Sequence, residues 1–425
     1  MTPQSAFMVC ATLDSTRRAE LEQLLTSMTS LPGQADPANA LIPFGAFERL
    51  HFARIVILED LAAGAEAPPP YLAFLGDCDG DGDAFLHELA ERTPDGLRRV
   101  FGYCRDFQPG TNLLRWMQDH ATPPATYYVN WVGRTVRQVR EEAALRAALV
   151  AYLREHAAVL PQQPPREIRA RLIAFVAAER QAGRLSLTQP TSTPPGWQLR
   201  NILHAAGVAL ALLALAPFLL LGLPFYLIRL RQLERSDAEI TPRPAAAHLA
   251  ALGAIEDHDV SNQFSAYGSI KPGRFRYWTL VFLLWVVNAT TRHIYTRGRL
   301  ARVPSIHFAR WVFLEGGRRL FFASNYDGSL DSYMDDFINK VAWGLNLVFS
   351  NGVGYPKTNF LILGGAKDEQ KFKYYIRRRQ LVTSVWYKAY PGLTAYDLAR
   401  NSAIRAAIEA SAMTEAETRR FLQMV

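Results

Sequence analysis

The chain has 425 residues, of which 49% are hydrophobic and 20% are charged, and its formal net charge is +8. This composition excludes wholesale disorder, and the length suits two domains that each bury a core of their own. The three cysteines, Cys10, Cys78 and Cys104, show no CxxC spacing, so neither a disulfide framework nor a zinc site is indicated. A reducing location is therefore expected.

Residues 1–185 predict one α+β unit. Runs rich in β-branched and aromatic residues predict strands, and runs with apolar residues at helical spacing predict helices. In chain order the predicted elements are strand, helix, two strands, helix and strand, at residues 7–13, 16–28, 51–59, 71–76, 83–101 and 125–132. Thr135, with Gln138 three residues later, is typical of an N-cap and predicts a further helix.

Residues 186–246 differ in composition from the rest of the chain. Polar, Pro-rich linkers at 186–200 and 236–246 enclose the segment 201–228, which contains no charged residue. A helix of that length exceeds the roughly 30 Å hydrocarbon core of a bilayer. We therefore expect this segment to be embedded in a membrane.

The flanks of the segment 201–228 argue against a simple crossing. Pro217 and Pro224 are expected to break or kink a helix, and arginines at both ends remove any direction that the positive-inside rule could give. A single crossing would also separate the two halves of the chain. A re-entrant hairpin or an in-plane anchor, with both ends on the cytoplasmic face, is therefore expected in preference to a single span.

Residues 247–425 predict the same order of elements again. The strands and helices fall at 264–270, 277–291, 307–315, 318–324, 331–349 and 383–390, and Thr394 is placed to cap a last helix. In this copy the first helix, 277–291, is hydrophobic all round. Such a helix either inserts at the membrane interface, with Tyr277, Trp278 and Trp285 as anchors, or packs against the segment 201–228.

A sequence repeat supports the two-copy interpretation. Residues 51–59 (HFARIVILE) and 307–315 (HFARWVFLE) are identical at seven of nine positions. A second pair of blocks, 74–85 and 322–333, follows in the same order, although the first copy has a longer, Pro-rich turn before it. Each copy thus predicts a ferredoxin-like βαββαβ repeat, and two such repeats can cover each other's apolar sheet faces.

This duplicated order of elements resembles the dimeric α/β-barrel superfamily, which includes dye-decolourising peroxidases and chlorite dismutases. The resemblance implies that the two ferredoxin-like repeats pack as an internal α/β barrel within one α+β chain. It covers most of the chain, and it concerns architecture rather than chemistry.

The HFAR tetrapeptides supply the first candidate site residues. Strand alternation places His and Ala on one face and Phe and Arg on the other. Pseudo-twofold symmetry relates His51 to His307 and Arg54 to Arg310. The histidines could border a cavity and ligate haem iron or move protons. The alternative is structural: each His and each Arg could simply bind a neighbouring element.

The resemblance adds a further candidate. Dye-decolourising peroxidases carry a GxxDG motif that supplies a distal aspartate, and Asp327 with Gly328 is similar to its last two residues. Asp327 is then implied as a distal acid and Arg310 as a distal arginine. No residue matches the proximal haem histidine of that family, so haem stays a possible cofactor only.

One loop matches a metal-binding pattern. The sequence from Asp77 to Glu88 fits the calcium-loop pattern D-x-D-x-D-G-x5-E. The candidate ligands are Asp77, Asp79, Asp81, Asp83 and Glu88. A strand precedes this loop where an EF-hand has a helix, and the second copy loses the glycine and two carboxylates. A turn followed by a helix N-cap is therefore the alternative to calcium.

Basic residues gather beside the predicted lipid-contacting segments, which favours membrane lipid over nucleic acid as the partner of the positive charge. We expect a membrane-associated protein that binds or transforms a hydrophobic, lipid-derived small molecule in a cavity between the repeats. A haem-dependent, peroxidase-like oxidoreductase and a non-catalytic membrane scaffold are the alternatives. Whether the protein is an enzyme stays open.

Overall fold

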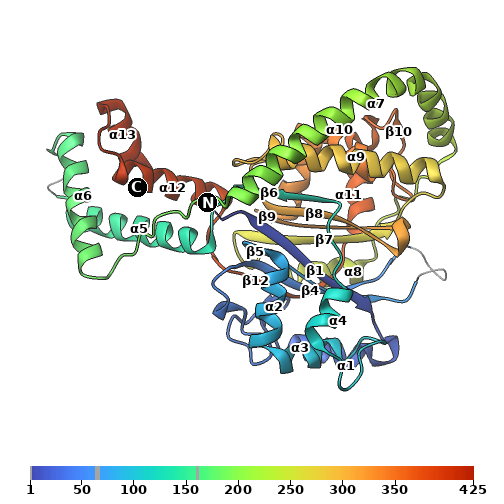
Figure 1. Ribbon diagram of the computed structural model, residues 1–425, viewed down its shortest axis with the longest axis horizontal. Coiled ribbons are helices and arrows are strands. Elements are labelled where there is room, and N and C mark those ends of the chain that lie inside the picture. Colours follow the sequence, from blue (N-terminus) through green and yellow to red (C-terminus); the bar gives the residue numbers. More distant parts are fainter. Residues whose placement is uncertain (1, 63–67, 159–161) are drawn as a thin grey trace.

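The two halves of the chain form α+β units in the predicted order. The computed structural model describes residues 2–62, 68–158 and 162–425. A six-stranded and a four-stranded sheet lie at the centre, and a group of helices projects to one side (Figure 1). The α+β class is therefore confirmed.

Repeat one is the unit that runs from β1 to β6. Its main elements are β1 (Gln4–Thr12), α1 (Arg18–Thr26), β4 (Leu50–Leu58), β5 (Tyr71–Asp79), α2 (Gly82–Arg92), α3 (Pro94–Phe101), α4 (Leu113–Asp119) and β6 (Thr126–Val129). Two short strands, β2 (Thr29–Leu31) and β3 (Gln34–Ala35), follow α1. The predicted helix at 83–101 is split because Pro94 begins a new helix at its first position. The Pro-rich turn between β4 and β5 lies partly outside the described residues.

Repeat two is the unit that runs from β7 to β12. Its main elements are β7 (Ser261–Ser269), α9 (Arg274–His293), β8 (Ile306–Leu314), β9 (Arg319–Asp327), α10 (Leu330–Phe349), α11 (Glu369–Arg377) and β12 (Thr383–Lys388). A small hairpin of β10 (Thr358–Asn359) and β11 (Leu363–Gly364) lies between α10 and α11.

The last strand of each repeat pairs with the other repeat. Strand β12 lies antiparallel to β4, which gives the larger sheet the order β1-β5-β4-β12-β3-β2. Strand β6 lies antiparallel to β8, which gives the smaller sheet the order β6-β8-β9-β7. Each repeat therefore completes the sheet of the other.

The predicted closed barrel does not form. The chain before each exchanged strand passes its own first strand, but the pairing there is an isolated bridge, Val9 with Ala121 and Ala266 with Gln380. A closed barrel needs a continuous ladder at both of these edges. Instead, the chain continues past each of these edges and pairs with the sheet of the other repeat.

The two sheets face each other across an apolar layer. Met8, Val56 and Leu75 of repeat one share a buried cluster with Val312 and Phe321 of repeat two. Separate cores lie on the outer side of each sheet, beneath its own helices. The sheet-to-sheet packing explains why both faces of β4, β5, β8 and β9 are buried along most of their length.

The helices that follow the exchanged strands form a separate lobe, which we call the helical arm (Figure 1, left). It comprises α5 (Val136–Glu155), α6 (Pro165–Gln181), α12 (Ala395–Glu409) and α13 (Glu415–Met424). The predicted caps are confirmed: the side chain of Thr135 caps α5, and that of Thr394 forms a capping box on α12. Leu149 of α5 and Ile404 of α12 are fully buried in the core of the arm.

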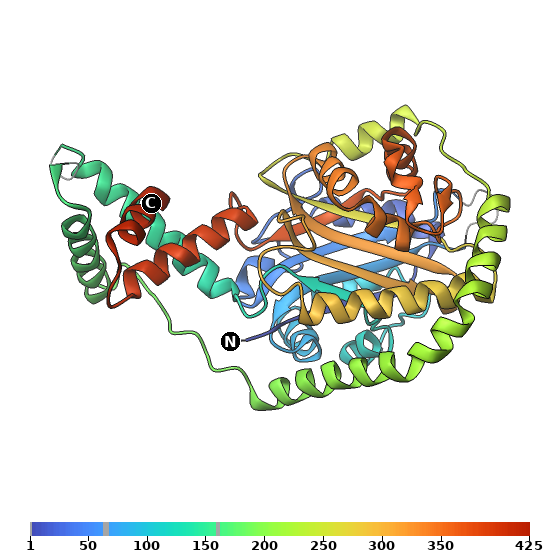
Figure 2. The same ribbon diagram turned by 90° about the horizontal axis from the view of Figure 1, so that it is seen from above.

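Helix α7 (Pro195–Ser236) is 42 residues long and continues through Pro217 and Pro224. It bends around repeat two beside α9 (Figure 2). The prolines therefore do not end this helix. A short helix, α8 (Ala246–Gly253), then leads into β7.

The buried leucine of the arm gives a test of this packing. We expect Leu149→Ala to lower the free energy of unfolding by about 2–5 kcal/mol, because it leaves a cavity in the arm's core. Urea denaturation of the detergent-solubilised protein measures the change. The control Leu199→Ala, at a side chain that is 58% exposed, should change it by less than about 0.5 kcal/mol. Equal effects of the two substitutions would contradict the packing.

Candidate functional site

Each HFAR strand carries a β-bulge at its histidine. The pairing of β4 with β5 shifts between Leu50 and Phe52, and that of β8 with β9 shifts between Ile306 and Phe308. The extra residue is His51 in one repeat and His307 in the other. A bulge re-aims the side chain it carries. Strict alternation, which we predicted to place His opposite Phe and Arg, is therefore broken at this position.

The bulges bring the two histidines into the layer between the sheets. The ring of His51 lies 5.2 Å from that of Phe308, and the ring of His307 lies 5.5 Å from that of Phe52. Both histidines are only 2% exposed. The His-Phe pair of each repeat thus packs against that of the other, which is the pseudo-twofold relation that the repeat implies.

His51 is bound at both ring nitrogens. Its Nε2 lies 2.9 Å from Oδ1 of Asp79, and its Nδ1 lies 3.1 Å from the hydroxyl of Tyr390. Burial raises the pKa of Tyr390 well above its ordinary value, so this hydroxyl keeps its proton. It can donate to Nδ1, which leaves the Nε2–H of a neutral imidazole to donate to Asp79.

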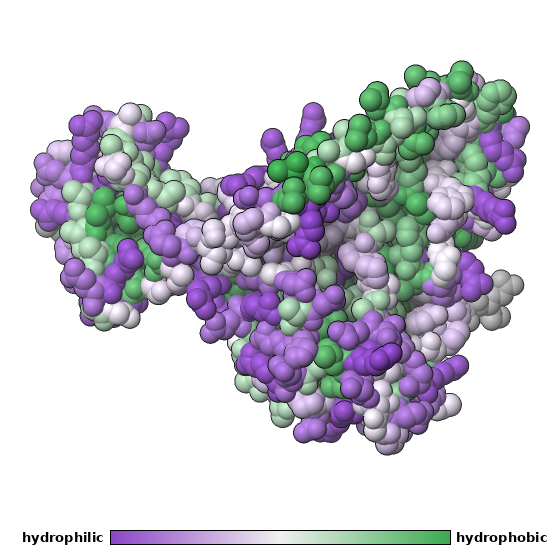
Figure 3. Space-filling view, viewed as in Figure 1, coloured by the Kyte–Doolittle hydropathy of each residue, from purple (hydrophilic) through white to green (hydrophobic). Residues whose placement is uncertain are grey.

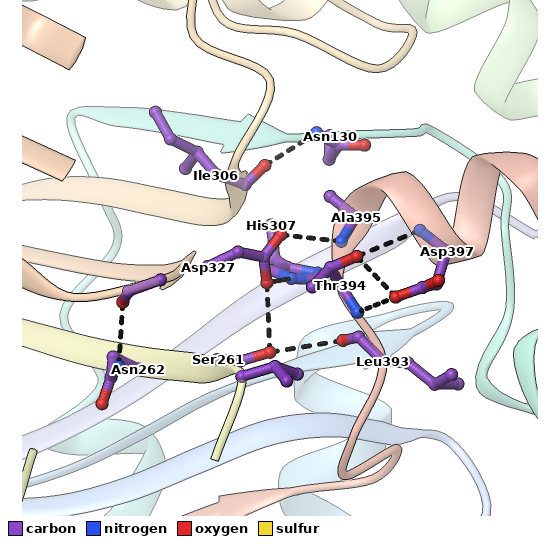
Figure 4. Close-up of polar contacts among 12 residues, drawn as sticks. Asn130, Ser261, Asn262, Ile306, His307, Asp327, Leu393, Thr394, Ala395 and Asp397 are labelled. Atoms are coloured by element: carbon purple, nitrogen blue, oxygen red, sulfur yellow. Dashed lines mark hydrogen bonds and ion pairs between the residues drawn. The ribbon is translucent and has the colours of Figure 1, made fainter. Parts of the chain in front are cut away.

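His307 forms the equivalent pair with Asp327, as Figure 4 shows. Its Nε2 lies 2.7 Å from Oδ1 of Asp327, and the other carboxylate oxygen accepts the backbone N–H of Ala395 at 2.7 Å. In repeat one Asp79 accepts the N–H of Val136 at 2.9 Å. Each carboxylate therefore binds a histidine and the first turn of the arm helix that follows its repeat. The two pairs connect the sheets to the helical arm.

The arginines of HFAR reach across to the opposite repeat. Arg54 donates to the carbonyls of Phe264 and Ser324 at 2.8 and 2.9 Å. Arg310 donates to the carbonyls of Phe7 and Gly76, both at 2.8 Å. These bonds are symmetric, because β1 and β5 of repeat one correspond to β7 and β9 of repeat two.

The charges at the centre are not symmetric. Arg310 forms an ion pair with Asp77, whereas Arg54 meets Asn325 at the corresponding position. The Asn325 amide also donates to Asp77 at 3.2 Å. Two buried arginines thus share one carboxylate. Burial, with Arg310 close by, lowers the pKa of Arg54 to about 9 in spite of Asp77, so Arg54 remains charged at neutral pH.

Two aromatic side chains complete this network. The Tyr127 hydroxyl donates to Asp77 and the Trp386 indole N–H donates to Asn325, each at 3.1 Å. Tyr127 lies on β6 and Trp386 on β12, the exchanged strands. Sequence analysis did not single out Asn325, Tyr127, Trp386 or Tyr390. A signal was nevertheless present, because the repeat blocks align Asn325 with Asp77.

The space enclosed by these residues is small. The cavity that Arg54, Asp77, Arg310 and Asn325 line holds about 10 Å³. This volume suits about one water molecule. It does not admit a haem or a lipid, and both nitrogens of His51 are already hydrogen-bonded. The residues between the repeats therefore do not fit the haem that the resemblance implied.

The two residues predicted as a distal pair, Arg310 and Asp327, also lie in different parts of the interface between the repeats. Arg310 lines the central cavity, whereas Asp327 binds His307 and the start of α12. Both residues serve contacts within the protein. The arrangement joins the two repeats through buried hydrogen bonds and ion pairs.

The calcium-loop residues do not converge on one point. Asp77 and Asp79 belong to β5 and bind Arg310 and His51, and Asp81 caps α2 through the N–H of Ala84. The remaining two candidates are Asp83, in the first turn of α2, and Glu88, which pairs with Arg49. Within the described ranges no three His, Cys, Asp or Glu side chains are grouped to hold a metal ion. The strand that leads into the loop prevents the EF-hand geometry.

Comparison with protein-family models, with curated proteins and with solved structures finds no match to this chain. The geometry of the chain itself is therefore the basis of what we propose below.

The shared carboxylate provides a second test. We expect Asp77→Asn to lower the free energy of unfolding by about 3–5 kcal/mol, because it leaves two buried arginines without a counter-charge. Adding Arg310→Met should restore part of that loss. The matched control is Asp81→Asn, where asparagine is an equally good N-cap, and a change below about 0.5 kcal/mol is expected. Denaturation by urea measures all three, and an Asp77→Asn protein as stable as the control would refute the assignment.

Proposed function

We propose that this protein works at a membrane surface, where α7 lies in the plane of the membrane and the two-repeat body binds a lipid-derived molecule. The observation that carries this proposal is the combination of an exposed apolar helix with two ends that are both fixed to repeat two.

The middle of α7 presents large apolar side chains to the surroundings. Leu213, Phe218, Leu221 and Phe225 are between 72% and 77% exposed. Of the described helices one, α7, is long and apolar enough to cross a membrane, and its most apolar window is 0% buried. Hydrophobic residues cover this helix in Figure 3. A patch of this size in water is unfavourable, which supports contact with lipid.

The N-terminal part of α7 is tied to the end of α9. Arg292 donates to the side-chain oxygen of Asn201 at 2.8 Å, and Nδ1 of His204 lies 2.9 Å from Nε2 of His293. At the other end of the pair, the ring of Tyr226 stacks on that of Phe275 at 5.1 Å. The two helices therefore run antiparallel, side by side.

The C-terminal part of α7 is held more firmly. The carboxylate of Glu234, which is buried, accepts the hydroxyl of Thr358 and the N–H of Leu361, both at 2.9 Å. Asp237, just past the helix, pairs with Lys271 at 2.7 Å. Both ends of the apolar segment thus meet the same folded unit.

Helix α9 is itself part of that unit. Leu280 and Leu284 lie in the core of repeat two, whereas Trp278 is 62% exposed. Its inner face is therefore occupied by the sheet, and its outer face can meet lipid together with α7. Because α9 cannot leave the sheet, α7 keeps its contacts when it lies along the membrane surface and loses them when it crosses. An in-plane anchor is accordingly favoured over a single span.

The binding site of the lipid-derived ligand predicted from the sequence has to be revised. The cavity between the sheets is too small, so we place the ligand on the side of repeat two that carries α7 and α9. We retain the cytoplasmic face as a prediction, because Cys10, Cys78 and Cys104 are free thiols.

Vesicle binding tests the anchor. We expect the double variant Leu213→Glu/Leu220→Glu to reduce partition into lipid vesicles by at least about 10-fold, because two side chains that contact lipid become charged. Flotation of the purified protein with vesicles gives the bound fraction. Leu31→Glu, at an exposed leucine of β2 that is 53% exposed, serves as the control and should bind as the wild type does. Unchanged flotation of the double variant would refute membrane contact through α7.

Cysteine labelling tests the path of α7. In a variant whose three native cysteines are alanine, single cysteines are introduced by Ser192→Cys or by Ala238→Cys, on either side of the helix. With an impermeant maleimide and sealed vesicles, an in-plane anchor predicts the same outcome for both positions. A single span predicts that one is labelled and the other is protected until detergent is added, and that pattern would overturn the in-plane proposal.

A further inference from the structure

An open pocket of about 670 Å³ lies between the start of α9 and the turn from β8 to β9. Its lining includes Lys271, Arg274, Tyr277, Arg318 and Arg319. The turn is tight: Gly317 has a φ of +86°, and a Cβ there would come within 2.2 Å of the Tyr277 ring. The short turn thus packs on α9 and leaves the basic side chains around an open space.

Two of these basic residues have no acidic partner. Arg274 and Arg318 are exposed, and in the described part of the chain neither forms an ion pair. Arg319 is neutralised by Asp60 and Glu315. Charge balance therefore leaves these two guanidinium groups available to an anion.

The rest of the cluster is balanced, because Lys271 and Arg276 against Asp237 leave one positive charge and Arg319 against Asp60 and Glu315 leaves one negative charge. Lys271 and Arg276 share one carboxylate, that of Asp237, at 2.7 and 2.5 Å. Nε and Nη1 of Arg276 are buried and have no hydrogen-bond partner in the described structure. The region thus combines net positive charge with concave shape, and guanidinium groups suit phosphate geometry well.

The pocket lies on the side of repeat two where α7 ends and α9 begins. Lys271 and Asp237 join it to the end of α7, and Trp278 follows Tyr277 on α9. Aromatic and basic side chains in this combination are typical of the headgroup level of a membrane.

An apolar cavity of about 40 Å³ adjoins the pocket, since Ser269 and Ile270 line both. Leu280, Phe322 and Ile376 are among its other lining residues. This cavity is far too small for an acyl chain, so the open pocket is suited to the headgroup and the chains of a bound lipid would stay in the membrane.

We propose that this pocket binds the phosphate of an anionic phospholipid, with Arg274 and Arg318 as the residues that contact it. The inference rests on the proposed membrane-surface function and names the class of lipid. Free phosphate offers the same chemistry, and the experiment separates the two sources.

The test compares the wild type with Arg274→Gln/Arg318→Gln. Flotation is measured with phosphatidylcholine vesicles and with vesicles that also contain phosphatidic acid. We expect the wild type to prefer the anionic vesicles. The double variant should lose about 30-fold of that preference, because it lacks two basic residues at the membrane surface. The matched control, Arg171→Gln/Arg420→Gln on the helical arm, removes the same charge away from the pocket and should lose less than about threefold.

The second measurement is calorimetry with inorganic phosphate. Preference for phosphatidic acid that persists in excess inorganic phosphate identifies the lipid headgroup as the source. Binding of inorganic phosphate that is lost in Arg274→Gln/Arg318→Gln, without a vesicle preference, identifies free phosphate and overturns the lipid assignment.

The remaining outcomes separate this inference from the proposed function. If the wild type binds neutral and anionic vesicles equally, or if the double variant behaves as the control does, the pocket assignment is wrong and the membrane anchor stands. If the wild type binds neither kind of vesicle, the membrane function itself is wrong.

Discussion

The buried arginine pair between the sheets is the interaction on which the rest of the structure depends. Arg54 and Arg310 each lie on one repeat and find their hydrogen-bond acceptors on the other. A buried guanidinium is costly unless those acceptors are in place. The strand exchange of β6 and β12 adds the same condition, because neither repeat completes its sheet alone. The two copies are therefore expected to fold as one unit, although they are far apart in sequence.

This coupling decides what α7 can do. Helix α7 lies between the two repeats in the sequence. Because the repeats form one folded body, both ends of α7 must connect to that body. Contacts such as Asn201 with Arg292 and Glu234 with Thr358 show that both ends are fixed in this way. A helix under that restriction bends along the surface of its own protein, and this is the reason for the in-plane anchor that we propose. Prolines inside a helix favour bending, and Pro217 and Pro224 suit an apolar helix that follows a curved body.

Much of the fold could be predicted from the sequence because the signals are local. The order of elements and the caps at Thr135 and Thr394 depend on neighbouring residues alone, and the repeat is visible by direct comparison of the two halves of the sequence. The strand exchange could not be predicted, since pairing partners such as β4 and β12 lie in opposite halves of the chain. For the candidate site, HFAR marked side chains that the structure brings together between the sheets. Their directions could not be predicted, because the bulges turn His51 and His307 toward the face that alternation assigned to Phe and Arg.

The two copies have diverged where the proposed function lies. At the start of α1 in repeat one, Arg18 is paired with Glu22 and with Glu59, at 2.8 and 2.7 Å. At the start of α9 in repeat two, Arg274 has no such partner in the described chain, and the turn after β8 is short. The same architecture thus gives an edge whose arginine is paired in one copy and an edge with unpaired arginines in the other. The hydrophobic helix α9 and the attachment of α7 occur on that second edge. Duplication supplied a stable pair of sheets, and the unpaired arginines of one copy alone are what would turn an edge of that pair toward an anionic membrane.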